Sequence, residues 1–310
     1  MKVTRLAGID IGTLTCRLLI ADLSPESPLK NLRSERRILK LGEGVDRTRR
    51  LSAVAMDRVI QCLKEWREVI DGYRVDGCAV VATSAVRDAQ NQAEFLARIK
   101  RETGFEIEIL SGEEEARRTM LGIRSGLPAS VRDMLALDIG GGSMEFILDR
   151  VGQPTAIRSI DIGVVRLCER LLHHDPPTDD EVRHARQWIT EETKAAIAGM
   201  GDHHIATFVG TAGTITTLAA MAQNLSAYDP VRIQNYRLSL GTIQELESQL
   251  LGRTKAQRVG FPGLEPGREE VIVAGTIILR AIMETLGEKE CLVSDLGLRE
   301  GELINLARKR

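Results

Sequence analysis

Aromatic residues make up only 3% of this 310-residue chain. Proteins that bind single-stranded nucleic acid stack bases on aromatic side chains, so this composition argues against such a platform. The chain also has 42 lysines and arginines against 44 aspartates and glutamates, which gives a net charge of -2. No overall positive field attracts a polyanion the size of DNA or RNA, and we expect no nucleic-acid partner.

Long apolar runs and paired cysteines are absent as well. No apolar run approaches the roughly 20 residues that span a bilayer, and the N-terminal MKVTRLAGIDIG lacks the apolar core of a signal peptide. The five cysteines show no C-x-x-C pair and no metal-ligand spacing, which favours buried, reduced thiols. We therefore expect a cytoplasmic protein with no membrane partner.

Strands alternate with helices along the sequence, which predicts an α/β fold. The first half begins with strand, turn and strand from Val3, followed by a third strand near residues 36–39. The pattern restarts at Met134, again with strand, glycine turn and strand, and then a third strand in TAIRSID. This restart puts a domain boundary near residues 124–131. Thr178 to Glu181 reads as a capping box that opens a long helix.

The two halves begin with the same strand-turn-strand motif. AGIDIGTLTCRLLIAD (residues 7–22) and LALDIGGGSMEFILD (residues 135–149) each contain an apolar strand, an Asp-Ile-Gly turn, a hydroxyl residue and a second apolar strand. The aligned pairs are Asp10 with Asp138, Gly12 with Gly140, and Thr15 with Ser143. We interpret the repeat as a diverged internal duplication.

The second copy, DIGGGS, is not a dinucleotide or P-loop fingerprint. Those motifs need a helix after the glycines, whereas MEFILD alternates with a period of two, as a strand does. A glycine-rich hairpin lets backbone N–H groups point at an anion. An aspartate before it would repel phosphate but can hold Mg²⁺ or orient a water. The alternative is a tight turn that needs glycine for its geometry alone.

The motifs taken in order resemble those of the exopolyphosphatase/guanosine pentaphosphate phosphohydrolase family, within the actin, heat-shock chaperone and sugar kinase superfamily. The matching segments are LGEGVDRTRRLS (41–52), ATSAVRDAQN (82–91), ILSGEEEARRTMLGI (109–123), LALDIGGGSMEF (135–146), VGTAGTITTLA (209–219) and SDLGLREGEL (294–303). Two positions depart from the family. Leu14 stands where the first loop usually has a polar Asn, and Met144 replaces a usual Thr.

The resemblance implies two ribonuclease H-like (actin-like) domains with a substrate cleft between them. They would comprise residues 1–125 and 126–298, with the C-terminal helix 299–310 packing back on the first domain. It also implies Mg²⁺ as cofactor, a role for K⁺ that stays open, and a homodimer.

The candidate base lies in SGEEEA. Ser111 followed by Glu114 fits a capping box, which would engage Glu114 with the backbone. The family's catalytic glutamate directly precedes Ala, and Glu115 matches it. Without the resemblance, all three glutamates could merely complement the positive end of a helix.

The remaining site residues rest on the resemblance and on loop position. Asp138 and Glu145 match an acidic pair, which we assign with Glu115 to catalysis, and we expect them with Asp10 to hold the metal. Arg87 is expected to contact phosphate, with a surface salt bridge as the alternative. The phosphate-binding candidates in the three loops are Asp10, Gly12, Thr13, Thr15; Gly140, Gly141, Gly142, Ser143; and Gly210, Thr211, Gly213, Thr214.

Other polar clusters carry weaker signals. The doublets His173-His174 and His203-His204 have no third ligand at metal spacing and are expected to be surface or capping residues. Arg47, Arg49 and Arg50 could line a polyphosphate channel, although a solvated loop face is the simpler interpretation.

The sequence thus predicts a Mg²⁺-dependent phosphohydrolase that removes terminal phosphate from inorganic polyphosphate, from guanosine pentaphosphate, or from both. Two rivals stay open. A kinase of the same fold would pass phosphate to a small acceptor, and a regulatory protein would bind guanosine polyphosphates without turnover.

Overall fold

The computed structural model describes residues 3–24, 27–201 and 207–309. By its internal contacts the chain divides into two compact units. Unit 1 comprises Met1–Ser125 together with Leu296–Arg310, and unit 2 comprises Gly126–Asp295. Across the described ranges, no helix has both the length and the apolar character that a membrane crossing requires.

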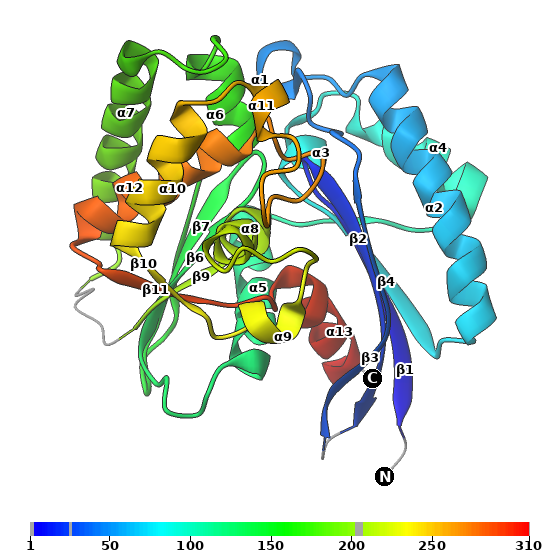
Figure 1. Ribbon diagram of the computed structural model, residues 1–310. Helices are drawn as coiled ribbons and strands as arrows, with labels where there is room; N and C mark the ends of the chain where they lie inside the picture. The colour runs from blue at the N-terminus through cyan, green and yellow to red at the C-terminus, as the bar shows by residue number, and fades with distance from the viewer. Residues whose placement is uncertain (1–2, 25–26, 202–206, 310) are drawn as a thin grey trace. The chain divides into compact units, whose positions relative to one another are not determined.

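Unit 1 contains a five-stranded sheet (Figure 1). Its strands are β1 (Thr4–Ile11), β2 (Thr15–Ser24), β3 (Ser27–Ile38), β4 (Gly77–Ala82) and β5 (Glu108–Ile109). The order across the sheet is β3-β2-β1-β4-β5. The first three strands are antiparallel neighbours, and β4 runs parallel to β1 and to β5. The carboxyl ends of β1, β4 and β5 therefore lie at one edge of the sheet.

Helices cover both faces of this sheet. They are α1 (Val45–Thr48), α2 (Ala53–Tyr73), α3 (Ser84–Asp88), α4 (Gln92–Thr103), α5 (Gly112–Gly126) and α13 (Leu298–Arg308). Side chains alternate along a strand. Ala7 and Ile9 accordingly join the core that contains α2 and α4, whereas Leu6 packs with Leu303 of α13. Figure 1 shows α2 and α4 on one side of β1 and β2 and α13 on the other.

Unit 2 repeats this topology. Its strands are β6 (Met134–Ile139), β7 (Met144–Asp149), β8 (Ala156–Ile160), β9 (Thr207–Thr211), β10 (Arg237–Ser239) and β11 (Glu290–Val293). The order β8-β7-β6-β9-β11-β10 begins like that of unit 1. Three antiparallel neighbours are followed by the parallel strands β9 and β11, and β10 is an additional edge strand antiparallel to β11. This shared order agrees with the duplication inferred from the two Asp-Ile-Gly turns.

The helices of unit 2 are α6 (Val164–Leu171), α7 (Asp179–Ala198), α8 (Ala212–Ala222), α9 (Pro230–Ile233), α10 (Leu240–Leu251), α11 (Lys255–Arg258) and α12 (Ile272–Leu286). Helix α12 packs against α6, α7, α8 and α10, and most of its residues are buried. The predicted capping box of α7 is confirmed, because Thr178 accepts a hydrogen bond from the backbone of Glu181 and the Glu181 carboxylate accepts one in return.

The predicted α/β class is therefore confirmed, and most predicted elements lie where the sequence puts them. The main difference is β3, which begins at Ser27 rather than near residue 36. It is an edge strand rich in arginine and lysine, so it lacks the apolar pattern on which the prediction relied. Part of the predicted HIATFVG strand lies outside the described residues.

Candidate functional site

The first Asp-Ile-Gly turn closes the hairpin between β1 and β2. The backbone N–H of Gly12 donates to the carbonyl of Thr15 at 2.9 Å, and Asp10, Thr13 and Thr15 are buried. The loop after β3 covers the turn, since the N–H of Gly42 donates to the carbonyl of Thr13 at 2.8 Å. The predicted strand, turn and strand are thus confirmed for the first copy, with Gly12 in the turn of a hairpin.

Leu14 fills the position where the family usually has a polar side chain. Here Leu14 is buried, and its carbonyl accepts the N–H groups of Leu39 and Lys40, both at 2.9 Å. The apolar side chain is therefore withdrawn from solvent, and the backbone of the turn is held by the segment that follows β3.

Arg17 lies directly opposite Asp10 in the antiparallel pair of β1 and β2. Paired residues of neighbouring strands put their side chains on the same face. The Nε atom of Arg17 is buried and has no hydrogen-bond partner among the residues that the structure describes. Sequence reasoning did not single out Arg17. The signal was its alignment with Glu145 in the duplicated motif.

Glu115 is held by Arg87. Arg87 follows β4 on the short helix α3, and Glu115 lies in the first turn of α5, which follows β5. The Nη1 atom of Arg87 donates to the Glu115 carboxylate at 3.3 Å and to the carbonyl of Leu110 at 2.8 Å. The structure thus brings together two of the predicted residues, and it gives Arg87 a carboxylate partner that the sequence did not predict.

The three glutamates of SGEEEA have different surroundings. The side chains of Glu113, Glu114 and Glu115 are 63%, 38% and 12% exposed, so only Glu115 is turned inward. Ser111 accepts the backbone N–H of Glu114 at 3.2 Å, as a capping residue does. The Glu114 carboxylate, however, accepts from Nε of Arg118 at 2.8 Å. The predicted backbone role of Glu114 is therefore corrected, because its carboxylate forms an ion pair with Arg118, a buried arginine one turn along the helix.

The second Asp-Ile-Gly turn presents two acids side by side. Asp138 on β6 pairs directly with Glu145 on β7, and both are buried. Ser159 on β8 donates to the Glu145 carboxylate at 2.8 Å. The same row of unit 1 holds Asp10 and Arg17, so the two copies carry opposite charges at this position: an arginine in unit 1 and a glutamate in unit 2.

The carbonyl groups of the second glycine turn are bonded to helix α6. Val164 N donates to the carbonyl of Gly140 at 3.0 Å, and Val165 N donates to that of Gly141 at 2.8 Å. Nε of the buried Arg166 donates to the carbonyl of Gly142 at 2.8 Å. With its three carbonyls engaged, the turn offers an anion N–H dipoles rather than carbonyl oxygens.

The contact between this turn and α6 depends on glycine at position 163. A Cβ atom at Gly163 would lie 2.4 Å from the carbonyl carbon and oxygen of Gly141. Real Cβ atoms essentially never come so close to backbone, so any side chain here would push α6 away from the turn. Sequence reasoning missed both Gly163 and Arg166, because nothing in the local pattern marks them.

The third loop lies between β9 and α8, as predicted. Thr211 ends β9 directly beside Asp138 of β6, and α8 begins at Ala212. A Cβ at Gly213 would lie 2.3–2.7 Å from the guanidinium atoms of Arg268, a buried arginine that also pairs with Glu265. Gly210 and Thr214 pack inward, against Cys291 and Gly275. The loop is therefore backed by a positive charge that the sequence did not reveal.

The acidic pair is the best candidate for a metal site. Within residues 3–24, 27–201 and 207–309, no three His, Cys, Asp or Glu side chains cluster closely enough to hold a metal on their own. Mg²⁺ commonly takes only one or two carboxylates and completes its shell with substrate phosphates and waters. Asp138 and Glu145 fit that requirement, with the glycine turn adjacent to both.

Two weaker candidates behave as structural groups. His174 bonds through Nδ1 to Glu181 at 2.9 Å, which agrees with a capping role, whereas His203-His204 lie outside the described residues. Arg47, Arg49 and Arg50 are exposed around α1, and Arg49 approaches Asp88 at 4.0 Å.

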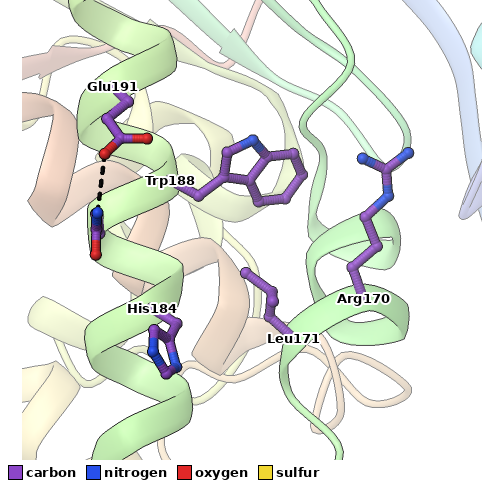
Figure 2. A pocket seen from close by; sticks show the side chains of 6 residues that line it. Arg170, Leu171, His184, Trp188 and Glu191 are labelled. Carbon is purple, nitrogen blue, oxygen red and sulfur yellow. Dashed lines mark hydrogen bonds between the residues drawn. The ribbon is translucent and has the colours of Figure 1, made fainter.

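A separate pocket of about 400 Å³ lies between α6 and α7 (Figure 2). Its lining residues are Arg170, Leu171, His184, Gln187, Trp188 and Glu191, and none of them is a predicted site residue. The guanidinium of Arg170 lies 5.3 Å from the centre of the Trp188 ring, a cation–π distance. The pocket is therefore distinct from the three loops.

Comparison with known proteins gives consistent matches. Residues 19–310 match the model of the Ppx/GppA phosphatase family. Exopolyphosphatase 2 of Mycobacterium tuberculosis is 36% identical over 319 residues, which cover 99% of this chain and 100% of that protein. The guanosine-5'-triphosphate,3'-diphosphate pyrophosphatase of Aeromonas hydrophila is 31% identical and matches 97% of this chain but only 59% of its own length.

A solved structure confirms the fold class. The Aquifex aeolicus member of the Ppx/GppA family has a TM-score of 0.84 and 34% identity, with 99% of each chain covered. Two α/β units with the same succession of strands agree with the predicted pair of ribonuclease H-like domains.

Proposed function

Because the chain belongs to the Ppx/GppA phosphatase family, we propose that it is a phosphohydrolase that removes the terminal phosphate of inorganic polyphosphate, of guanosine pentaphosphate, or of both. The relative named as an exopolyphosphatase aligns over its entire length, whereas this chain spans 59% of the relative named as a guanosine-5'-triphosphate,3'-diphosphate pyrophosphatase. This difference in coverage supports polyphosphate as the first substrate to test.

The observation that carries the proposal is the pattern of backbone hydrogen bonds in the second glycine turn. Its carbonyls at Gly140, Gly141 and Gly142 all accept bonds from α6, and the N–H of Gly140 donates to the carbonyl of Ser143 at 3.0 Å, so the N–H groups of the other turn residues would be the ones to meet an anion. Glu145 and Asp138 lie immediately beside it. A phosphate-binding turn next to paired carboxylates suits phosphoanhydride hydrolysis better than either feature alone.

The two hairpins would then have different tasks. Arg17 gives the first hairpin a positive charge opposite Asp10, so we assign it to phosphate oxygens along with the turn residues Gly12, Thr13 and Thr15. Asp138 and Glu145 make the second hairpin the place for Mg²⁺, which supplies charge to neutralise phosphate oxygens. Asp10 is the remaining acidic candidate. The third loop, backed by Arg268, would hold a further phosphate.

Glu115 is our candidate for activating water. Its carboxylate is turned inward and oriented by Arg87. It would accept a proton from a water whose oxygen attacks the terminal phosphorus, while the bond from that phosphorus to the bridging oxygen breaks. The shortened polyphosphate leaves with the electrons of that bond. The homodimer and the Mg²⁺ that the resemblance implies are part of the same proposal, as is the cytoplasmic location expected from the apolar and cysteine patterns of the sequence.

The test is a phosphate-release assay on long polyphosphate, short polyphosphate, guanosine pentaphosphate and ATP, with and without Mg²⁺. We expect Mg²⁺-dependent release from at least one of the first three substrates. Glu115→Gln should lower kcat by about 10²- to 10⁴-fold, the usual contribution of general acid–base catalysis. Glu113→Gln, an exposed neighbour, is the matched control and should keep its activity.

Three outcomes would contradict the proposal. A folded Glu115→Gln protein with the full rate would remove Glu115 from the mechanism. Phosphate transfer to a small acceptor without release to water would favour a kinase. Binding of guanosine pentaphosphate with no release of phosphate would favour a regulatory protein.

A further inference from the structure

The chain passes between its two units twice, at Ser125–Gly126 and at Asp295–Leu296. One side chain of unit 2 is bonded to both crossings. Nε2 of Gln234 donates to the carbonyl of Gly126 at 2.9 Å, and Oε1 of Gln234 accepts the backbone N–H of Asp295 at 2.8 Å. The donor and acceptor ends of one amide thus join the first and last residues of unit 2.

The chemistry of the partners fixes the orientation of this amide. Gly126 offers a carbonyl, which only the NH₂ end can serve, and Asp295 offers an N–H, which only the oxygen can accept. A flipped amide would lose both bonds and oppose like groups. Nδ2 of Asn235 adds a second, longer bond to the Gly126 carbonyl at 3.3 Å.

The segment that carries Gln234 is itself anchored. The backbone N–H of Gln234 donates to the carbonyl of Pro230 at 2.9 Å, which ends helix α9. The next residue, Asn235, donates its N–H to the carbonyl of Val293 at 2.8 Å, and Val293 ends β11. Gln234 is therefore attached to the central sheet of unit 2 rather than to a free loop.

Within unit 1 the two crossing helices touch through glycine. A Cβ on Gly122 of α5 would lie 1.9 Å from the carbonyl oxygen of Gly297, and a Cβ on Gly301 of α13 would lie 1.7 Å from that of Arg118. The side chain of Arg118, only 3% exposed, bonds to Glu302 of α13 at 2.6 Å. Helices α5 and α13 therefore behave as one body within unit 1.

Helix α5 carries Glu115 in its first turn, in unit 1, and ends at Gly126, whose carbonyl accepts a hydrogen bond from Gln234. We propose that Gln234 is a positioning residue, which fastens both chain crossings to the sheet of unit 2 and thereby sets the placement of Glu115 for the reaction. This inference rests on the role proposed for Glu115. Gln234 itself need not touch substrate.

Two substitutions separate the two bonds of Gln234. Gln234→Leu keeps a similar volume and loses both of these bonds, together with the one that Nε2 of Gln234 donates to Oδ1 of Asn235 at 3.2 Å. Gln234→Glu keeps an acceptor for the Asp295 N–H but sets a second acceptor against the Gly126 carbonyl. Gln244→Leu is the matched control, because Gln244 is also in unit 2 and bonds only a surface carboxylate, that of Glu284 at 3.1 Å.

The first readout is steady-state kinetics on the best substrate of the panel. We expect Gln234→Leu to lower kcat by about 10- to 100-fold, since small misplacements of reacting groups have effects of this size. KM should change by less than about 3-fold, because the phosphate-binding turns are untouched. Gln234→Glu should fall between the wild type and Gln234→Leu, and Gln244→Leu should stay within about 2-fold of the wild type.

The second readout is the distance between one spin label in each unit, measured by double electron–electron resonance on the full chain. Spin labels at Glu68→Cys in α2 and Lys194→Cys in α7 report on units 1 and 2, with Cys78 and Cys168 replaced by Ser. Gln234→Leu should broaden the distance distribution, and Gln244→Leu should not. This readout needs no activity.

An unchanged kcat or an unchanged distance distribution in Gln234→Leu would overturn the inference. So would a lower kcat explained by a lower thermal midpoint with an unchanged distribution, because that result indicates a merely structural role. If the wild type released no phosphate from any substrate, the proposed function would fail, while the spin-label distances would still decide whether Gln234 fastens the crossings.

Discussion

Nη1 of Arg87 lies 3.3 Å from the carboxylate of Glu115 and donates to the carbonyl of Leu110 at 2.8 Å. One nitrogen thus ties the candidate base to the chain that leaves β5. Two roles are open to such an arginine. It can bind a phosphate, or it can orient the glutamate, and these roles have different kinetic signatures.

We predict that Arg87→Gln acts mainly on kcat. A hydrogen bond to a charged group contributes about 1.5–3 kcal/mol. If its loss falls on the transition state, the rate decreases by about 10- to 100-fold. Arg98→Gln removes an ion pair with the exposed Asp57 in the same unit and serves as the control. Michaelis–Menten analysis decides the point, since a rise in KM at constant kcat would instead mean that Arg87 only binds phosphate.

The opposite charges of Arg17 and Glu145, at corresponding positions of the two hairpins, lead to the second prediction. Arg17→Gln should raise KM by about 10-fold or more and leave the Mg²⁺ concentration for half-maximal activity unchanged. Glu145→Gln should raise that Mg²⁺ concentration. Titration of Mg²⁺ at saturating substrate measures the difference. Equal effects of both substitutions on the Mg²⁺ requirement would refute the division of tasks.

Gly163→Ala should damage both stability and activity. The new methyl group would meet the backbone of Gly141 at 2.4 Å, so α6 or the turn must move. Overpacking of this kind costs about 1–3 kcal/mol. Gly241→Ala, in helix α10 with no atom closer than 3.8 Å, is the control. Urea unfolding and phosphate release on both variants test the prediction, and a Gly163→Ala protein as stable and active as the control would disprove it.

Glu181 gives a prediction about pH. Burial favours its neutral form, but the side chain of His174 and the backbone N–H groups of Thr178 and His173 outweigh this and lower the pKa of Glu181 from 4.5 to about 2. Because the folded pKa lies below the unfolded one, the stabilisation is complete above about pH 5 and disappears as the pH falls towards 2. The urea midpoint of the wild type should exceed that of Glu181→Gln at pH 7 and pH 5, and the gap should narrow at pH 4 and pH 3. A gap that widens on acidification would contradict this assignment.

Local patterns predicted the parts of the molecule that depend on neighbours in sequence. Alternation of apolar residues identified the hairpins, and the capping box of α7 followed from Thr178 and Glu181. Contacts between distant segments were invisible. Arg268 reaches the loop at Gly213, and Gly163 reaches Gly141, only because the fold brings those segments together.

The glutamates show the same limit on a smaller scale. Spacing alone suggested that Glu114 would bond the backbone. Instead its carboxylate accepts from Arg118, whose guanidinium also bonds Glu108 and Glu302. A capping rule considers one helix end, and a buried guanidinium competes with it. Glu115 is the next residue of the same helix and so points in a different direction from Glu114, towards the interior.

The discontinuity of unit 1 bears on how the protein is made. Unit 2 is continuous from Gly126 to Asp295, but unit 1 lacks α13 until residues 298–308 have been made. Leu303 of that helix fills the sheet face beside Leu6, and a Cβ at Gly8 would lie 3.1 Å from it. During synthesis, one face of the sheet of unit 1 therefore stays uncovered by α13 while the residues of unit 2 are made. A chain without α13 would leave that face exposed in the unit that carries Glu115.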